Sequence, residues 1–230
     1  MTHFNWTQLI PAVGHHYTHI ATLIVACLVM VLLAIAGRLA LGNIQTTGYI
    51  PSSRFGIKGL FEAATEFIVS ISDMVIGKDG RVYVPMFVTI FFYVLINNVF
   101  GLLPGWTPAT GDLNTTLALG IFMFLAYNYY GIREHGFAYI KQFMGPLLFL
   151  APFMFVVELI SHSVRPISLG LRLQGNMSGD HILMGVFYSL YEYVLPIPLM
   201  FLGLFVCFMQ AFVFTMMGMI YVSMAISHDH

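Results

Sequence analysis

The residues best suited to chemistry lie in one stretch of otherwise apolar sequence, between positions 158 and 181. Several recur at helical spacing and would share one side of a helix. This polar stripe consists of Glu158, His162, Arg165, Ser168, Arg172, Asn176 and Asp180. Carboxylates and imidazoles take up and release protons, whereas an arginine stays protonated and acts as a fixed positive charge. The polar stripe therefore indicates a site that handles protons or ions around a permanent cation, Arg172.

The composition places this stripe in a membrane protein. Of 230 residues, 59% are hydrophobic and 8% are charged, against about 25% charged in an ordinary soluble domain. A charged side chain at the bilayer centre costs roughly 2.5–3.5 kcal/mol, so the stripe must face water, protein or a translocated ion. A net charge of −1 offers no basic surface for nucleic acid. Cys27 and Cys207 lie in apolar runs and are too few for a disulfide framework or a metal site.

The apolar pattern predicts an all-α polytopic membrane protein that forms one membrane domain. We expect about five crossing helices, at 18–41, 82–103, 114–132, 147–190 and 196–226. The second and third would form one hairpin, and the last two another. Residues 55–77 place apolar and charged side chains on opposite faces of a helix, which predicts one amphipathic helix at the membrane interface.

The segment 147–190 is too long for an upright span. As one helix it would measure about 66 Å, against a hydrocarbon core of ~30 Å. Two spans with a turn near Pro166 are the alternative. The polar stripe keeps its helical register across Pro166, which favours a single bent helix. We therefore expect the last two helices to be long and strongly tilted.

Loop charges predict the orientation of the chain. The connector 38–81 carries five Lys or Arg residues and 131–145 carries two, so both should be cytoplasmic. With five crossings, the N-terminus lies outside and the C-terminus inside, and we expect a bacterial plasma membrane. Glu158 and His162 then lie toward the cytoplasm, and Asp180 toward the outside.

The sequence around the central arginine resembles that of the F-type ATP synthase subunit a family, the stator of the proton channel in the membrane sector. Residues 168–177 read SLGLRLQGNM, similar to the family's SLGLRLFGNM, with Gln174 in place of the usual Phe. Residues 210–214 read QAFVF, similar to the family's last helix. The tracts 98–104 and 112–116 also resemble family sequence.

The resemblance implies a rotary proton path. In the family, an essential arginine, matched by Arg172, faces a ring of c subunits that each carry a membrane carboxylate. Two offset half-channels connect these carboxylates to opposite sides of the membrane. The arginine prevents a short circuit between them and drives deprotonation.

The resemblance also implies which partners the chain has. They are the c-subunit ring, b-type peripheral stalk subunits and the rest of the F1Fo ATP synthase, within the lipid bilayer and without nucleic acid. Neither a cofactor nor a metal is implied, and the coupling ion is by family default H+ rather than Na+. The chain has no GxxxxGK[ST] loop, so we expect it to bind no nucleotide and not to be an enzyme by itself.

Motif positions assign further site residues by resemblance. Asn176 matches a family asparagine one turn beyond the arginine, and Gln210 matches the glutamine of the last helix. Glu158 matches an acidic position on the cytoplasmic side. His181 matches an outer half-channel site that is Glu or His in the family. On an ideal helix Asp180 shares the side of Arg172 and His181 does not, so either residue could be the outer relay.

Three further residues are candidates for the proton path. Gly203 stands where some members of the family have a titratable residue, and Glu192 and Asp112 are the candidates to replace it in the proton path. Ser168 is a path candidate that could instead bond to its own helix.

Glu158 and His162, four residues apart, form either a proton relay or a structural pair. Arg165 beside Pro166 is compatible with a structural role, bonded to backbone carbonyls.

Two other functions are compatible with a membrane arginine. An ion-coupled secondary transporter could use Arg172 as an anion clamp, but it should show internal repeats and broken helices, which the sequence lacks. A purely structural subunit leaves the polar stripe unexplained. His15 and His19 would share a helical face, but no third metal ligand is nearby.

Overall fold

The computed structural model describes residues 18–40, 57–103, 106, 108–136, 151–190 and 196–226, and over these residues the chain is helical with short turns. The long helices are α1 (Thr18–Ala40), α2 (Ile57–Val75), α3 (Val84–Leu102), α4 (Leu113–His135), α6 (Ala151–Leu190) and α7 (Pro196–Ile226). Two short 3-10 helices are η3 (Lys78–Val82) and η4 (Ala109–Gly111). Within the described residues, five helices are long and apolar enough to cross a membrane: α1, α3, α4, α6 and α7. The predicted all-α membrane architecture is confirmed.

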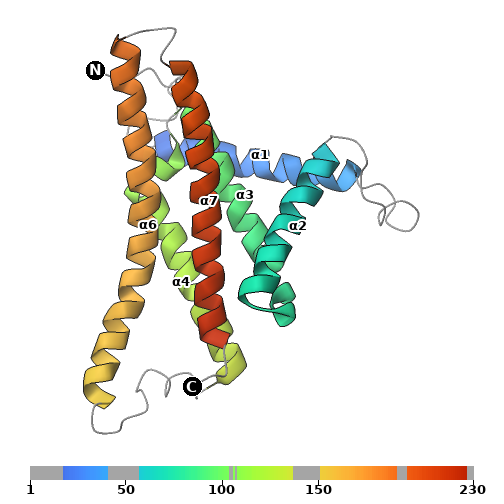
Figure 1. The fold of residues 1–230 in the computed structure, drawn as a ribbon, viewed down its shortest axis with the longest axis vertical. Helices are drawn as coiled ribbons and strands as arrows, with labels where there is room; N and C mark the ends of the chain where they lie inside the picture. The colour runs from blue at the N-terminus through green and yellow to red at the C-terminus, as the bar shows by residue number, and fades with distance from the viewer. Residues whose placement is uncertain are drawn as a thin grey trace.

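Helices α6 and α7 form a long antiparallel pair, with α3 and α4 lying diagonally behind it (Figure 1). α6 is one helix of 40 residues that continues through Pro166. At 1.5 Å per residue it is about 60 Å long, twice the thickness of a hydrocarbon core. α1 has 23 residues, so it can span a bilayer only if it stands close to the membrane normal. α1 runs across the direction of α6 and α7 (Figure 1). If α1 stands along the membrane normal, α6 and α7 are therefore strongly tilted away from that normal.

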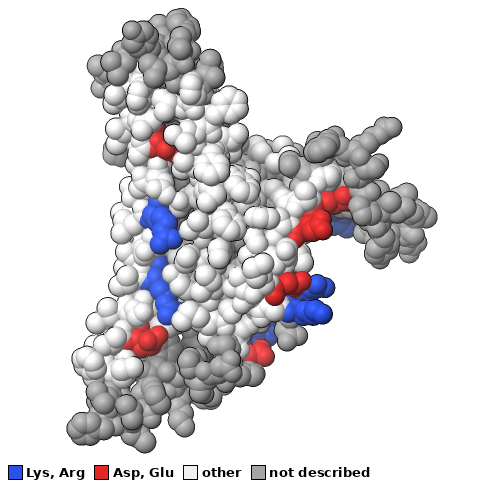
Figure 2. All heavy atoms as spheres, in the orientation of Figure 1, with Lys and Arg blue, Asp and Glu red and all other residues white. Residues whose placement is uncertain are grey.

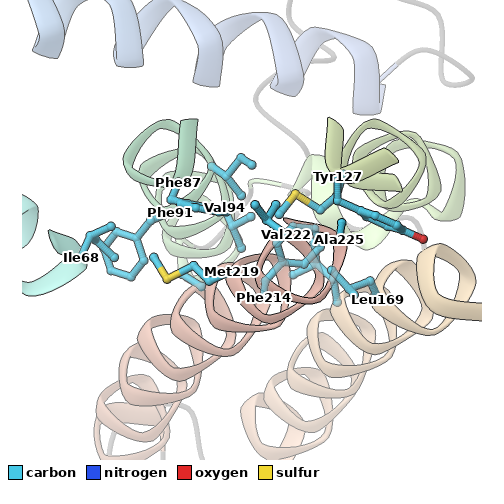
Figure 3. Close-up of a cluster of buried hydrophobic side chains, with 14 residues drawn as sticks. Ile68, Phe87, Phe91, Val94, Tyr127, Leu169, Phe214, Met219, Val222 and Ala225 are labelled. Atoms are coloured by element: carbon cyan, nitrogen blue, oxygen red, sulfur yellow. The ribbon is translucent and has the colours of Figure 1, made fainter. Parts of the chain in front are cut away.

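The buried core joins α6 and α7 to the helices behind them. Figure 3 shows apolar side chains from α2, α3, α4, α6 and α7 meeting in one cluster, including Phe87, Phe91, Tyr127, Leu169, Phe214 and Met219. Leu169 and Leu173 are the residues of α6 in this cluster, at 4% and 0% exposure. They flank Arg172 in sequence, so their burial determines which face of α6 presents the arginine.

The amphipathic helix α2 packs against the bundle. Ile68 is part of the buried core, and the ring of Phe67 lies 5.7 Å from that of Phe212 in α7. At the end of α2, the guanidinium of Arg81 donates to Asp73 at 2.7 and 3.1 Å. This hydrogen bond lowers the pKa of the partly exposed Asp73 carboxyl below its usual value. The apolar face of α2 is thus covered partly by protein and not only by lipid.

Two glycines let α4 and α6 approach closely. A Cβ atom on Gly170 would lie 3.0 Å from the carbonyl oxygen of Thr116 and 3.2 Å from Cα of Leu117. A Cβ atom on Gly120 would overlap the carbonyl oxygen of Pro166. Backbone cannot move aside as a flexible side chain can, so these contacts require glycine. They fix α6 against α4 within a few residues of Arg172.

We predict that Gly120→Ala destabilises the protein by about 1–3 kcal/mol, the usual cost of overpacking a well-packed contact. Denaturant unfolding of the purified chain in detergent measures this. Gly179→Ala is the control, because no atom lies within 4 Å of a Cβ placed there and alanine is the better helix former. Equal stability of the two variants would contradict a close α4–α6 contact at Gly120.

Candidate functional site

The polar stripe runs along one edge of α6. Figure 2 shows basic surface in the middle of this edge and acidic surface toward both ends. The charged groups of the stripe are Glu158, Arg165, Arg172 and Asp180. Arg172 is exposed, and so are its apolar neighbours Ile167 and Leu171. The arginine is therefore set in an apolar exposed surface near the middle of a membrane-crossing helix.

Arg172 has no ion pair or hydrogen bond within the described part of the chain. Two described carboxylates contact other cations, Asp73 that of Arg81 and Glu158 that of Arg165. A packing role for Arg172, paired with Asp180, is therefore not what the geometry supports. An intramembrane cation needs a counter-charge or water. For Arg172 that group must come from outside the described residues.

A polar pocket lies beside the exposed arginine, between α3, α6 and α7. Its polar lining is Asn98, Asn176, Asp180 and Gln210, and its apolar lining is Leu173, Met177, Val206 and Cys207. The side-chain amide of Asn176 donates to the carbonyl oxygen of Gln210, joining α6 to α7. Asn98 accepts a hydrogen bond of 2.9 Å from Thr110. The half-buried Asp180 thus shares a pocket with three amides.

About one helical turn along the chain from pocket residues Asn98 and Val206, α3 and α7 come close together at Leu102 and Gly203. A Cβ atom on Gly203 would lie 2.5 Å from Cδ2 of Leu102. Leu102 is buried and fills the space that a larger residue at 203 would need. A larger residue at 203 would require the Leu102 side chain to move, and Asp180 of α6 is the acidic group that lines the pocket.

A second polar cluster lies nearer the start of α6. Nε2 of His162 is 3.2 Å from Oε1 of Glu158, and Nη2 of Arg165 is 3.8 Å from the same oxygen. Nδ1 of His162 is 3.1 Å from the hydroxyl oxygen of Tyr127 in α4. The guanidinium of Arg165 lies 5.2 Å from the centre of the Tyr221 ring in α7. The cluster thus connects the polar stripe to two other helices.

Comparison with known proteins decides the family. Residues 19–223 match the sequence profile of the family described as ATP synthase A chain. The chain belongs to the ATP synthase A chain family.

Three bacterial relatives, each named ATP synthase subunit a, illustrate the similarity. That of Bdellovibrio bacteriovorus is 52% identical over 228 residues, which cover 99% of either chain. That of Trichlorobacter lovleyi is 40% identical over 88% of this chain and 85% of its own. That of Geobacter sulfurreducens is 40% identical over 76% of each chain. This is a multi-pass membrane subunit of an ATP synthase, and family membership favours that interpretation over a secondary transporter.

The predicted site residues fall into three groups in this ATP synthase subunit. Arg172, Asn176, Asp180 and Gln210 lie at or beside the pocket, and Glu158 and His162 lie in the second cluster. His181 is not among the residues that line the pocket. Ser168 is exposed on the stripe, and Glu192 lies outside the described residues.

Asp112, a candidate for the proton path, has a structural role. It is the N-cap residue of α4, and its carboxylate accepts a 2.8 Å hydrogen bond from the backbone N–H of Asn114. Within the described residues no group of three or more His, Cys, Asp or Glu side chains could hold a metal ion. His15, and the side chain of His19, lie outside what the structure describes.

Sequence reasoning missed the partners that other helices supply. Tyr127 of α4 and Tyr221 of α7 contact the second polar cluster, and nothing in the local sequence pattern distinguishes either of them as a partner. Only the pair Asn97-Asn98, two amides in an apolar helix, carried a local signal. Asn98 does reach the pocket, and Asn97 donates to the carbonyl of Tyr93 in its own helix.

We predict that Asn176 and Gln210 are energetically coupled. Asn176→Leu should cost about 1–3 kcal/mol of unfolding free energy, because it removes the donor from a buried carbonyl. In the double variant with Gln210→Leu, the two losses should sum to clearly more than the measured loss, since both polar partners are gone. A double-mutant cycle in detergent measures the coupling. Strictly additive losses would contradict the hydrogen bond between α6 and α7.

Proposed function

We propose that the chain is the proton-translocating stator subunit of an F-type ATP synthase, with Arg172 between two offset half-channels. The observation that carries this proposal is the exposed Arg172, which has no counter-charge among the described residues. Large apolar side chains are exposed around it on α6 and α7, including Leu171, Phe201 and Phe205. A surface of this kind suits a membrane partner that brings a carboxylate, which is the chemistry of a c-subunit ring.

The fixed charge of Arg172 accounts for both parts of the proposed mechanism. Its positive field stabilises an ionised carboxylate that arrives opposite it, so that carboxylate gives up its proton. The same field repels a hydrated proton, so protons do not pass directly from one half-channel to the other. Arginine suits this task because it keeps its charge at any physiological pH.

The two polar clusters supply the half-channels in this proposal. Asp180, with Asn98 and the Asn176–Gln210 pair, forms the outer one. Glu158 lies at the cytoplasmic end of the polar stripe and exchanges protons with the inner side. Of the two outer candidates the pocket favours Asp180 over His181, because Asp180 lines it.

The assembly and the orientation follow from the same proposal. The c-ring covers the exposed face of α6 and α7, and b-type stalk subunits hold the chain against the torque of the ring. In a bacterial plasma membrane the N-terminus would lie outside and the C-terminus in the cytoplasm. Rotation driven by proton flow would then power ATP synthesis in the attached F1 head.

We predict that Arg172→Ala abolishes ATP-driven acidification of inverted membrane vesicles while the complex still assembles, because the barrier and the deprotonating charge are both lost. Asp180→Asn should lower the pumping rate by about tenfold or more, as expected when a proton-transfer group is removed. His181→Gln is the matched control and should pump at nearly the wild-type rate. Normal pumping by Arg172→Ala would refute the proposed function, and a greater loss in His181→Gln than in Asp180→Asn would move the outer relay to His181.

A further inference from the structure

Both ring nitrogens of His162 have a partner. Nδ1 is 3.1 Å from the hydroxyl oxygen of Tyr127, and Nε2 is 3.2 Å from Oε1 of Glu158. Tyr127 is 1% exposed in the core of the bundle, and the side chain of His162 is 12% exposed. The imidazole is therefore held between a buried hydroxyl on α4 and a carboxylate of the polar stripe.

These two contacts determine which nitrogen carries the proton in the neutral ring. An ionised carboxylate can only accept a hydrogen bond, so Nε2 must donate to Glu158. Nδ1 then presents a lone pair, and the hydroxyl of Tyr127 donates to it. The opposite tautomer would set the lone pair of Nε2 against the carboxylate. The geometry thus selects the Nε2-protonated form.

Arg165 makes a second positive charge at His162 unfavourable. Its guanidinium lies 3.8 Å from the same oxygen of Glu158 and is held over the ring of Tyr221 in α7. Glu158 thus already has a permanent cation beside it. A protonated His162 would have to share that one carboxylate with Arg165, whereas a neutral His162 donates to it without adding charge.

The position of Nδ1 also argues against proton passage through the ring. An imidazole relays a proton when one nitrogen takes a proton up as the other releases one. Nδ1 faces the hydroxyl of Tyr127, whose side chain is buried in the core of the bundle on α4. By contrast, Oε2 of Glu158 has no hydrogen-bond partner among the described residues, and this side chain is 39% exposed.

We propose that His162 is a positioning residue that stays neutral and bridges Tyr127 to Glu158, while Glu158 alone exchanges protons. The carboxylate of Glu158 takes a proton at Oε2 from the side of the c-subunit ring and releases it to water on the cytoplasmic side. The Nε2 proton of His162 stays where it is throughout. This inference rests on the proposed proton path, and it adds Tyr127 as the residue that orients the bridge.

Two substitutions of His162 separate a bridge from a carrier. A glutamine can accept from Tyr127 through its carbonyl and donate to Glu158 through its amide, but it cannot carry a proton. His162→Gln should therefore keep most of the ATP-driven pumping of the assembled complex. His162→Leu should lose about tenfold, because both partners are left unpaired. If His162→Gln pumps as poorly as His162→Leu, the imidazole itself carries the proton and the bridge is refuted.

Nitrogen-15 spectra of the histidine rings test the tautomer without reference to pumping. The complex is labelled on histidine, and the His162 signals are identified by their absence from His162→Gln. Wild type should show a neutral ring protonated on Nε2, and Tyr127→Phe should shift these signals toward a mixture of tautomers. Tyr129→Phe, an exposed tyrosine on the same helix, is the control and should leave them unchanged. A neutral ring protonated on Nδ1 in wild type would refute the bridge.

The two proposals fail in different ways. If Arg172→Ala pumps normally, the proton path is wrong whatever the tautomer of His162. If Arg172→Ala is inactive and His162→Gln is inactive too, the path stands and only the bridge is wrong.

Discussion

The structure depends on one electrostatic constraint, which is the cost of keeping a permanent cation inside a membrane. Arg172 cannot lose its charge, and the described residues offer it no carboxylate. The two carboxylates that share the polar stripe with Arg172 are placed elsewhere. Glu158 contacts Arg165, and Asp180 lines the pocket between α3, α6 and α7. Among the described residues, the charge of Arg172 is therefore not balanced. This imbalance supports the proposal that the exposed face of α6 meets a partner rather than lipid.

The scaffold behind that face holds α6 in one rotational setting. Leu169 and Leu173 bind it to the core, and the glycine contacts with α4 leave it no room to turn. A helix that rotated by a third of a turn would bury the arginine against apolar side chains, at a cost of several kcal/mol. Close packing and electrostatics thus act on the same residues, which explains why the polar motif is interleaved with leucine and glycine.

Much of the fold could be predicted from the sequence, because membrane helices are recognised by local properties. Apolar length identified the crossing helices, and the helical register across Pro166 indicated that α6 is a single helix. In the site, spacing alone placed Asp180 on the side of Arg172 and His181 off it. The contacts between helices that are distant in sequence could not be predicted. The bond from Tyr127 to His162 spans 35 residues, and no local pattern marks either residue as a partner of the other. The N-cap role of Asp112 was missed for a different reason, since a carboxylate before an apolar helix is compatible with both a cap and a proton path.

The packing of Leu102 against Gly203 links the side-chain sizes at these two positions. A Cβ atom on residue 203 would lie 2.5 Å from Cδ2 of Leu102, so a larger residue there requires the leucine side chain to move. Leu102 is buried at the contact of α3 with α7, and its movement would change how these two helices pack. The volume of the side chain at one position therefore limits the choice at the other.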